Sequence, residues 1–171
     1  SRILPYKIMI MKLTTRGHYS VKALLDLSLQ PAGKVSSVSD ISARQSLPAP
    51  YLEKLLIELR RSHIVSSVRG ARGGYRLAKA PAQISLGQIL EAVGESTSAL
   101  VNGIADETAN GTANGAASAT AKAAEDWVTS MLWQRLHQKI KEAFESITLE
   151  DLYYDARSWQ AAQGEGASFV V

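Results

Sequence analysis

Two arginines, Arg69 and Arg72, lie among glycines in the segment VRGARGGYRL, residues 68–77. A guanidinium group binds phosphates and the edges of guanine bases through paired N–H donors, and glycine lets a backbone turn sharply and approach a ligand closely. The segment therefore favours contact with the backbone or minor groove of a nucleic acid. The plain alternative is a Gly-rich turn between two strands with no ligand at all.

Residues 48–61, PAPYLEKLLIELRR, precede this segment and predict an amphipathic helix whose first turn accommodates the two prolines. Its apolar face follows the i, i+3, i+4, i+7 spacing and consists of Leu52, Leu55, Leu56 and Leu59. Three residues lie at its exposed start, Tyr51, Glu53 and Lys54. We expect these three to reach base edges in a major groove, where Glu53 can accept a hydrogen bond from the amino group of cytosine.

The elements that must position the wing arginines and the exposed residues of the 48–61 helix are helices and a hairpin. Residues 13–29 predict a first helix capped by Thr14, and Ser39 is expected to cap a second helix over residues 40–45. The apolar residues around 64–68 and 75–77 predict the two strands of the hairpin. This order is typical of a winged helix-turn-helix, in which one helix enters the major groove and the hairpin is the wing. Expected phosphate contacts are Thr14, Arg16, Arg60 and Arg61.

The charge distribution places a polyanion-binding surface in the first half of the chain. The 171 residues carry a net charge of +3, but residues 1–80 hold 14 Lys and Arg against 4 Asp and Glu, and residues 81–171 hold 5 against 12. We expect no catalytic and no metal-binding residues: the chain has no cysteine, its three histidines are scattered, and no Lys-Ser or Lys-Thr of a nucleotide loop follows Gly74. No apolar run is long enough to span a membrane.

Four segments together resemble the IscR-type family of winged-helix transcription regulators, with the glycine-rich wing as the most specific match. They are MKLTTRGHYSVKALLDLSL, DISARQ, YLEKLLIELRRSHIVSSVRGARGGYRLAK and ISLGQILEAV. The resemblance implies a mainly α fold with a small β-wing, a cytoplasmic bacterial location, and a homodimer that binds double-stranded operator DNA. The alternative is a cluster-free co-regulator that acts by docking a metabolic enzyme or another protein.

The C-terminal half predicts a long helix over residues 125–146. Apolar residues recur on it at steps of four, namely Val128, Leu132, Leu136, Ile140 and Phe144. This face is broader than a small domain needs, so we expect a dimerisation helix, the alternative being that it packs on its own domain. We expect the chain to divide into residues 1–10 as an extension, leader or ordered arm, 11–94 as the winged domain, 95–124 as a flexible loop, 125–156 as the dimerisation helix and a short last helix, and 157–171 as a loose tail.

The resemblance also implies a cofactor that this sequence is not equipped to hold. Members of the family often carry a two-iron two-sulfur cluster on three cysteines of the loop before the long helix, and here that loop contains none. Alanine, asparagine and threonine do not replace thiolate ligands. Two interpretations stay open: a natural member without a cluster, or a chain in which cysteines were replaced by alanine. In either case we expect no cofactor for the sequence as it stands.

We predict that this chain assembles no iron–sulfur cluster and that its DNA binding is independent of redox state. Without thiolates, a site would need the hard or borderline donors of His137, Asp106, Glu107, Glu125 and Asp126, which hold a sulfide-bridged iron pair poorly. Anaerobic reconstitution with iron and sulfide, followed by absorption spectroscopy and sulfide analysis, measures this. A coloured protein with stoichiometric iron and acid-labile sulfide would contradict the prediction.

Overall fold

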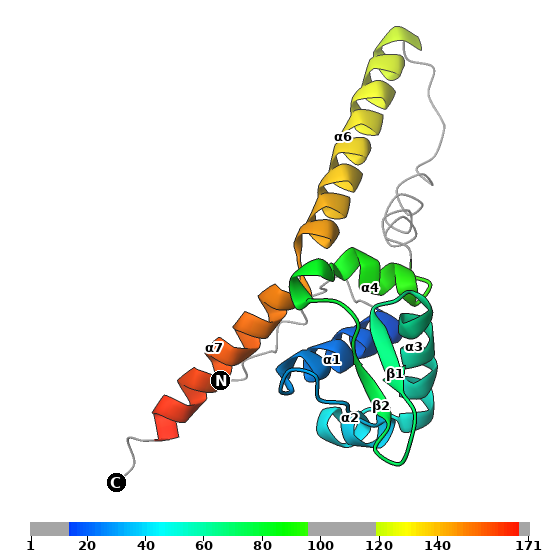
Figure 1. The fold of residues 1–171 in the computed structure, drawn as a ribbon. Coiled ribbons are helices and arrows are strands. Elements are labelled where there is room, and N and C mark those ends of the chain that lie inside the picture. Colours follow the sequence, from blue (N-terminus) through cyan, green and yellow to red (C-terminus); the bar gives the residue numbers. More distant parts are fainter. Residues whose placement is uncertain (1–13, 96–118, 168–171) are drawn as a thin grey trace, which may run out of the picture.

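The computed structural model describes residues 14–95 and 119–167, and it is mainly helical with one two-stranded sheet (Figure 1). The first part contains the helices α1 (Thr15–Leu29), α2 (Val38–Gln45), α3 (Ala49–Arg61) and α4 (Leu86–Ala92), the strands β1 (Val65–Val68) and β2 (Gly74–Leu77), and the short 3-10 helix η1 (Pro81–Gln83). The second part contains the helices α6 (Ala119–Ser146) and α7 (Leu149–Ala167). Figure 1 shows α1 to α4 and the hairpin packed into one body, from which α6 and α7 extend in different directions.

The core of this body forms where the apolar faces of α1, α3 and α4 meet. The four leucines predicted for α3 are all buried, and so are Ala23 and Leu24 of α1 and Ile89 and Leu90 of α4. Ile41 of α2 and Leu149 of α7 are also fully buried. The predicted helical periodicities are therefore confirmed, and α7 is fixed to the domain at its first residue.

The hairpin is an antiparallel pair in which Val65 lies opposite Leu77 and Val68 lies opposite Gly74. A third segment extends it, because Ser36 and Tyr75 exchange backbone hydrogen bonds of 2.9 and 2.8 Å. Gly74 makes this approach possible: a Cβ at this position would lie 2.2 Å from the carbonyl oxygen of Ser36. The wing is thus attached to the segment that leads into α2.

A buried carboxylate joins α1 to α2. Asp26 is 3% exposed, and its two oxygens accept hydrogen bonds from Arg44 Nε at 2.9 Å and Arg44 Nη2 at 2.7 Å. Gln45 Nε2 donates a further bond of 2.9 Å to the same carboxylate. Arg44 Nη2 also donates to Ser36 Oγ at 3.0 Å, so the network reaches the residue that holds the wing.

The starts of two helices differ from the sequence-based expectations, and Thr14, which directly precedes α1, makes no side-chain capping hydrogen bond. Ser37, and not Ser39, caps α2, because its side chain and that of Asp40 form a reciprocal capping box. The hydrogen bonds that the Asp40 carboxylate makes with the side chain of Ser37 and, to a smaller extent, with its backbone lower the pKa of Asp40. The long helix begins at Ala119 and not at Glu125, since alanine and lysine favour helix.

The prediction of a loose tail from residue 157 is wrong over most of its length. Helix α7 continues to Ala167, through a segment rich in alanine and glutamine, and the two glycines within it do not end the helix. Residues 1–10 and most of the predicted flexible loop, 96–118, lie outside the described residues.

The predicted apolar face of α6 is uncovered along most of its length in a single chain. The exposed fractions are 59% for Val128, 53% for Leu132 and 40% for Leu136, whereas Phe144 at 8% is buried where α6 contacts α4. Phe144 therefore fixes the end of α6 to its own domain. None of the helices in residues 14–95 and 119–167 combines the length and apolar content needed to cross a bilayer.

We predict that Asp26→Asn lowers the free energy of unfolding by about 1.5–3 kcal/mol, because the charged hydrogen bonds of a buried acceptor are lost. Glu142→Gln is the matched control: it removes an exposed ion pair with Lys139, and pairs of this kind contribute little. Urea titrations of both variants measure the difference. Equal midpoints for Asp26→Asn and the unaltered chain would show that the network does not stabilise the fold.

Candidate nucleic-acid interface

Helix α3 presents the side chains that the sequence predicted for base contacts. Its leucine face is buried against the core, which turns Glu53 and Lys54 fully outward. Tyr51 is half-buried, and its ring packs edge-on against Tyr19 of α1 with the centroids 5.8 Å apart. The first turns of α3 therefore carry one aromatic ring that packs against α1 and two exposed charged side chains.

The turn between α2 and α3 is held by one backbone conformation and two hydrogen bonds. Ser46 adopts a left-handed conformation with φ 53°, and Lys22 Nζ donates to the carbonyl oxygen of Gln45 at 2.8 Å. Ser42 Oγ donates to the carbonyl oxygen of Leu47 at 2.5 Å. Together they fix the direction in which α3 leaves the turn, as a helix-turn-helix requires.

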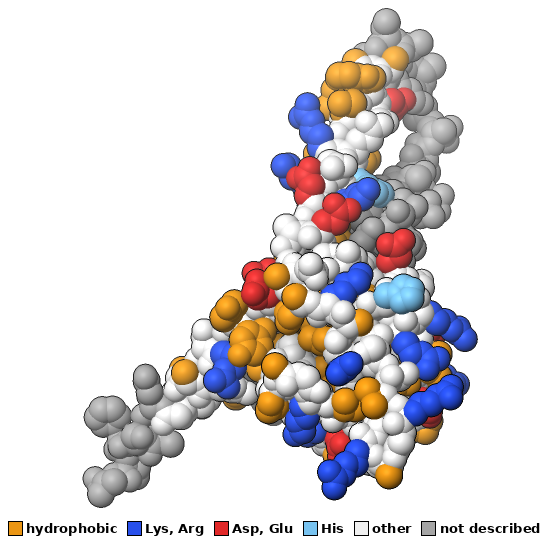
Figure 2. All heavy atoms as spheres, viewed as in Figure 1, with side chains coloured by type: hydrophobic (Ala, Val, Ile, Leu, Met, Phe, Trp, Pro, Cys, Tyr) orange, Lys and Arg blue, Asp and Glu red, His pale blue; other side chains and the backbone are white. Residues whose placement is uncertain are grey.

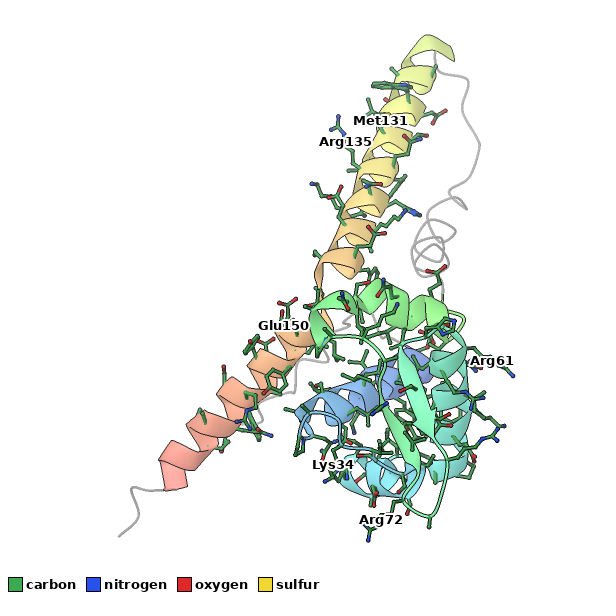
Figure 3. The ribbon with its side chains drawn as sticks, in the orientation of Figure 1. Lys34, Arg61, Arg72, Met131, Arg135 and Glu150 are labelled. Atoms are coloured by element: carbon green, nitrogen blue, oxygen red, sulfur yellow. The ribbon has the colours of Figure 1, made fainter. Side chains whose placement is uncertain are left out.

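The wing presents its arginines at the tip of the hairpin. Arg69 and Arg72 are both exposed, and a Cβ on the intervening Gly70, whose φ is +122°, would be strained. Figure 3 shows Arg72 at the end of the domain that α2 and the hairpin share, with Arg61 on the side formed by α3. The described structure thus brings the wing tip and α3 to neighbouring parts of one surface.

Two of the four residues expected to contact phosphates have partners within the domain. Arg16 Nη2 donates to Glu58 Oε2 at 2.5 Å, and its Nε donates to the carbonyl oxygen of Val93 at 2.9 Å. The bond to Glu58 raises the pKa of Arg16. Arg60 Nη1 donates to Ser67 Oγ of β1 at 3.3 Å, while Arg61 and Thr14 are exposed.

Basic side chains gather on this part of the molecule. Figure 2 shows Lys and Arg along the α3 side of the domain and at the wing end, whereas the Asp and Glu in this view lie mostly along α6 and the start of α7. The bond from Arg44 to Asp26 raises the pKa of Arg44. The arrangement can bind a polyanion through its exposed cations and read a groove with α3.

Sequence reasoning missed the residues that hold this surface in shape. Asp26 and Arg44 are far apart in sequence and match no motif, so their pairing has no signal in a single chain. No sequence pattern predicts the backbone pairing of Ser36 with Tyr75 either. The glycines at 73 and 74 were interpreted as part of the hairpin tip, and the approach of Ser36 to Gly74 was not predicted.

The donor set does not fit the cluster that the resemblance implied. The sequence contains no cysteine, and within residues 14–95 and 119–167 no three His, Asp or Glu side chains lie close enough to share a metal ion. Thiolates hold such clusters, and the carboxylates and single histidine of α6 do not replace them.

Comparison with known proteins assigns the chain to a family. Residues 13–155 match the profile of the Rrf2 family, described as an iron-dependent transcriptional regulator. A protein of Synechocystis sp. named among the HTH-type transcriptional regulators is 58% identical over 161 residues, which cover 94% of this chain and 100% of the relative. IscR of Vibrio cholerae is 36% identical over 146 residues, 85% of this chain and 76% of the relative.

Solved structures agree with the sequence relatives. IscR of T. potens is similar with a TM-score of 0.62 and 34% identity, over 87% of this chain and 90% of that one. CymR, the global cysteine regulator of B. subtilis, has a TM-score of 0.62 and 29% identity, over 84% and 96%. These relatives are transcription regulators and not enzymes, which confirms the predicted class and the resemblance to IscR. The chain belongs to the Rrf2 family of helix-turn-helix transcriptional regulators.

Proposed function

We propose that this regulator binds operator DNA sequence-specifically as a homodimer, with α3 in the major groove and the wing on the adjacent minor groove or backbone. The observation that carries the proposal is the start of α3, where Glu53 and Lys54 are exposed and Tyr51 is half-buried, on a helix that lies next to the hairpin (Figure 1). Tyr51 is held by Tyr19, so its ring is already placed before DNA arrives. The tip arginines, Arg69 and Arg72, follow the minor groove or phosphates.

The phosphate contacts fall into two groups under this proposal. Arg61 and Thr14 are exposed and approach the DNA backbone directly. Arg60 lies close to the wing through Ser67, and Arg16 reaches phosphates only by leaving Glu58. We therefore assign Arg16 the additional role of setting the position of α3 through its bond to Glu58.

The dimer is supported by the apolar row on α6. Val128, Leu132 and Leu136 are exposed in the single chain, and a row of large exposed apolar side chains on one helix face marks a protein contact. A second copy of α6 offers the same row, as a two-fold dimer requires. Ile140 continues this row toward the domain, and Phe144 ends it with its side chain buried in its own protomer.

We predict that substitutions of two arginines reduce DNA affinity in different ways. Arg69→Ala should cost roughly 1–3 kcal/mol on a duplex selected for tight binding, whereas Arg61→Ala should weaken all duplexes equally and reduce the salt slope by about one. Arg135→Ala, on α6 and away from this surface, is the control (Figure 3). Anisotropy titrations over a salt series measure all three. Unchanged specific binding by Arg69→Ala would remove the wing from the readout, and salt-independent binding would favour docking to a protein.

We predict that Leu136→Glu separates the protomers and abolishes tight operator binding. Burial of each large apolar side chain contributes about 1.5–3 kcal/mol, and a charge in the row reverses that contribution. Gln134→Glu introduces the same charge on the opposite face of α6 and should leave the dimer intact. Sedimentation at micromolar concentration decides the matter: a monomeric unaltered chain would rule out the proposed dimer.

A further inference from the structure

A cavity of about 450 Å³ opens where α7 meets the domain, away from the surface proposed for DNA. Its walls come from the C-terminal end of α1 and the turn that follows, the wing strand β2 with the segment after it, and the first turns of α7. Its volume is within the range of small-molecule sites in proteins. None of its lining residues comes from α2 or α3.

The chemistry of the walls is basic and aromatic. Lys34, Arg76 and Lys79 line the cavity together with a single carboxylate, Glu150, so the charged side chains leave a net charge of +2. Arg76 and Lys79 take part in none of the ion pairs within the described part of the chain. Their positive charge is therefore available to a ligand.

Two tyrosines and two leucines complete the cavity. The rings of Tyr153 and Tyr154 meet edge-to-face with centroids 5.4 Å apart, and Leu27 and Leu77 add apolar surface. Aromatic rings accept a planar group, and the cations in the same lining accept a carboxylate or phosphate through charge-assisted hydrogen bonds. A ligand that carries both a planar ring and an anionic group would use both kinds of side chain, whereas an inorganic anion would use only the cations.

The position of the cavity argues against DNA as its occupant. Figure 3 shows Glu150 where α7 joins the domain and Lys34 lower down beside α2, with Arg61 on the opposite side of the domain. Figure 2 shows hydrophobic and basic side chains intermixed where α7 joins the domain, unlike the mainly basic side formed by α3. A hollow lined by tyrosines and a carboxylate suits a small molecule better than a duplex backbone.

We propose that this cavity binds a small aromatic anion, with its ring against Tyr153 and Tyr154 and its carboxylate or phosphate on Arg76 and Lys79. Such a ligand would contact both α7 and β2, and β2 is one of the two strands of the wing. Ligand binding would therefore add contacts between the wing and α7 to those that already attach each of them to the domain. The binding step does not depend on the proposed function, whereas this effect on the wing rests on it.

Calorimetric titration of the full chain without DNA tests the binding step. Phenyl phosphate is the probe, and benzylamine and inorganic phosphate are its matched cationic and ring-free counterparts. We expect saturable binding of one phenyl phosphate per chain at millimolar concentrations, with much weaker binding of the other two. Absence of saturable binding, or equal binding of inorganic phosphate, would overturn the proposal.

Two variants test whether the ligand binds in the cavity. Arg76→Gln and Tyr153→Leu should each weaken phenyl phosphate by about tenfold, the loss expected for one charged or aromatic contact. Arg135→Ala on α6 and Trp159→Leu on the exposed outer part of α7 are the matched controls and should bind as the unaltered chain does. Circular dichroism and thermal unfolding are used to check that all four variants are folded. Unchanged probe affinity in Arg76→Gln and Tyr153→Leu would contradict the assignment.

A DNA titration separates this proposal from the proposed function. If Arg76→Gln weakens a duplex in the absence of ligand but leaves phenyl phosphate binding unchanged, the cavity belongs to the DNA surface and the proposal is wrong. If phenyl phosphate binds as expected and changes duplex affinity only in the unaltered chain, both the site and its effect on the wing are supported. Failure of the chain to bind DNA leaves the calorimetric result intact.

Discussion

Asp26 lies buried in the last turns of α1, and its carboxylate accepts hydrogen bonds from Arg44 and Gln45 of α2. Arg44 continues to Ser36, whose backbone pairs with Tyr75 of the wing. One buried charge therefore connects the first helix, the helix-turn-helix and the hairpin. A lone buried carboxylate is costly, so this connection forms only when all three elements are in place. The relative position of α3 and the wing follows from that requirement.

The network explains why the two proposed DNA-binding elements act as one surface. A recognition helix and a wing fit two grooves at once only if their spacing is fixed before binding, since ordering them on the DNA would cost conformational entropy. The close approach of Ser36 to Gly74 also holds the wing in place, and the bond from Arg16 to Glu58 also holds α3 against α1. Tyr51 is similarly held by Tyr19.

The parts that sequence reasoning anticipated are those governed by local periodicity. The leucine stripe of α3, the hairpin with its glycine tip and the long apolar face of α6 all follow from spacing, and each occurs in the structure. The Asp26–Arg44 pair, the internal partner of Arg16 and the burial of Phe144 depend on which segments meet in three dimensions, so a single sequence gives no sign of them. The extent of α7 was not anticipated, although alanine and glutamine favour helix and α7 continues through Gly164 to Ala167.

Membership of the Rrf2 family and the absence of cysteine together separate DNA recognition from cluster chemistry in this chain. Every residue proposed to contact DNA lies before Lys79, and none depends on a thiolate. The cavity beside α7 offers a different route for a regulatory input, because one of its walls is the strand that carries the wing.

The central claim is that two copies of the surface formed by α3 and the wing read one operator. Selection of tight-binding duplexes from a random library, followed by sequencing, tests it most directly. A two-fold dimer reads two inverted half-sites whose centres lie one helical turn apart, about 10 base pairs, or a multiple of this spacing. Enrichment of such an inverted repeat is the predicted result. Enrichment of a single unrepeated motif, or of no motif at all, would contradict the account.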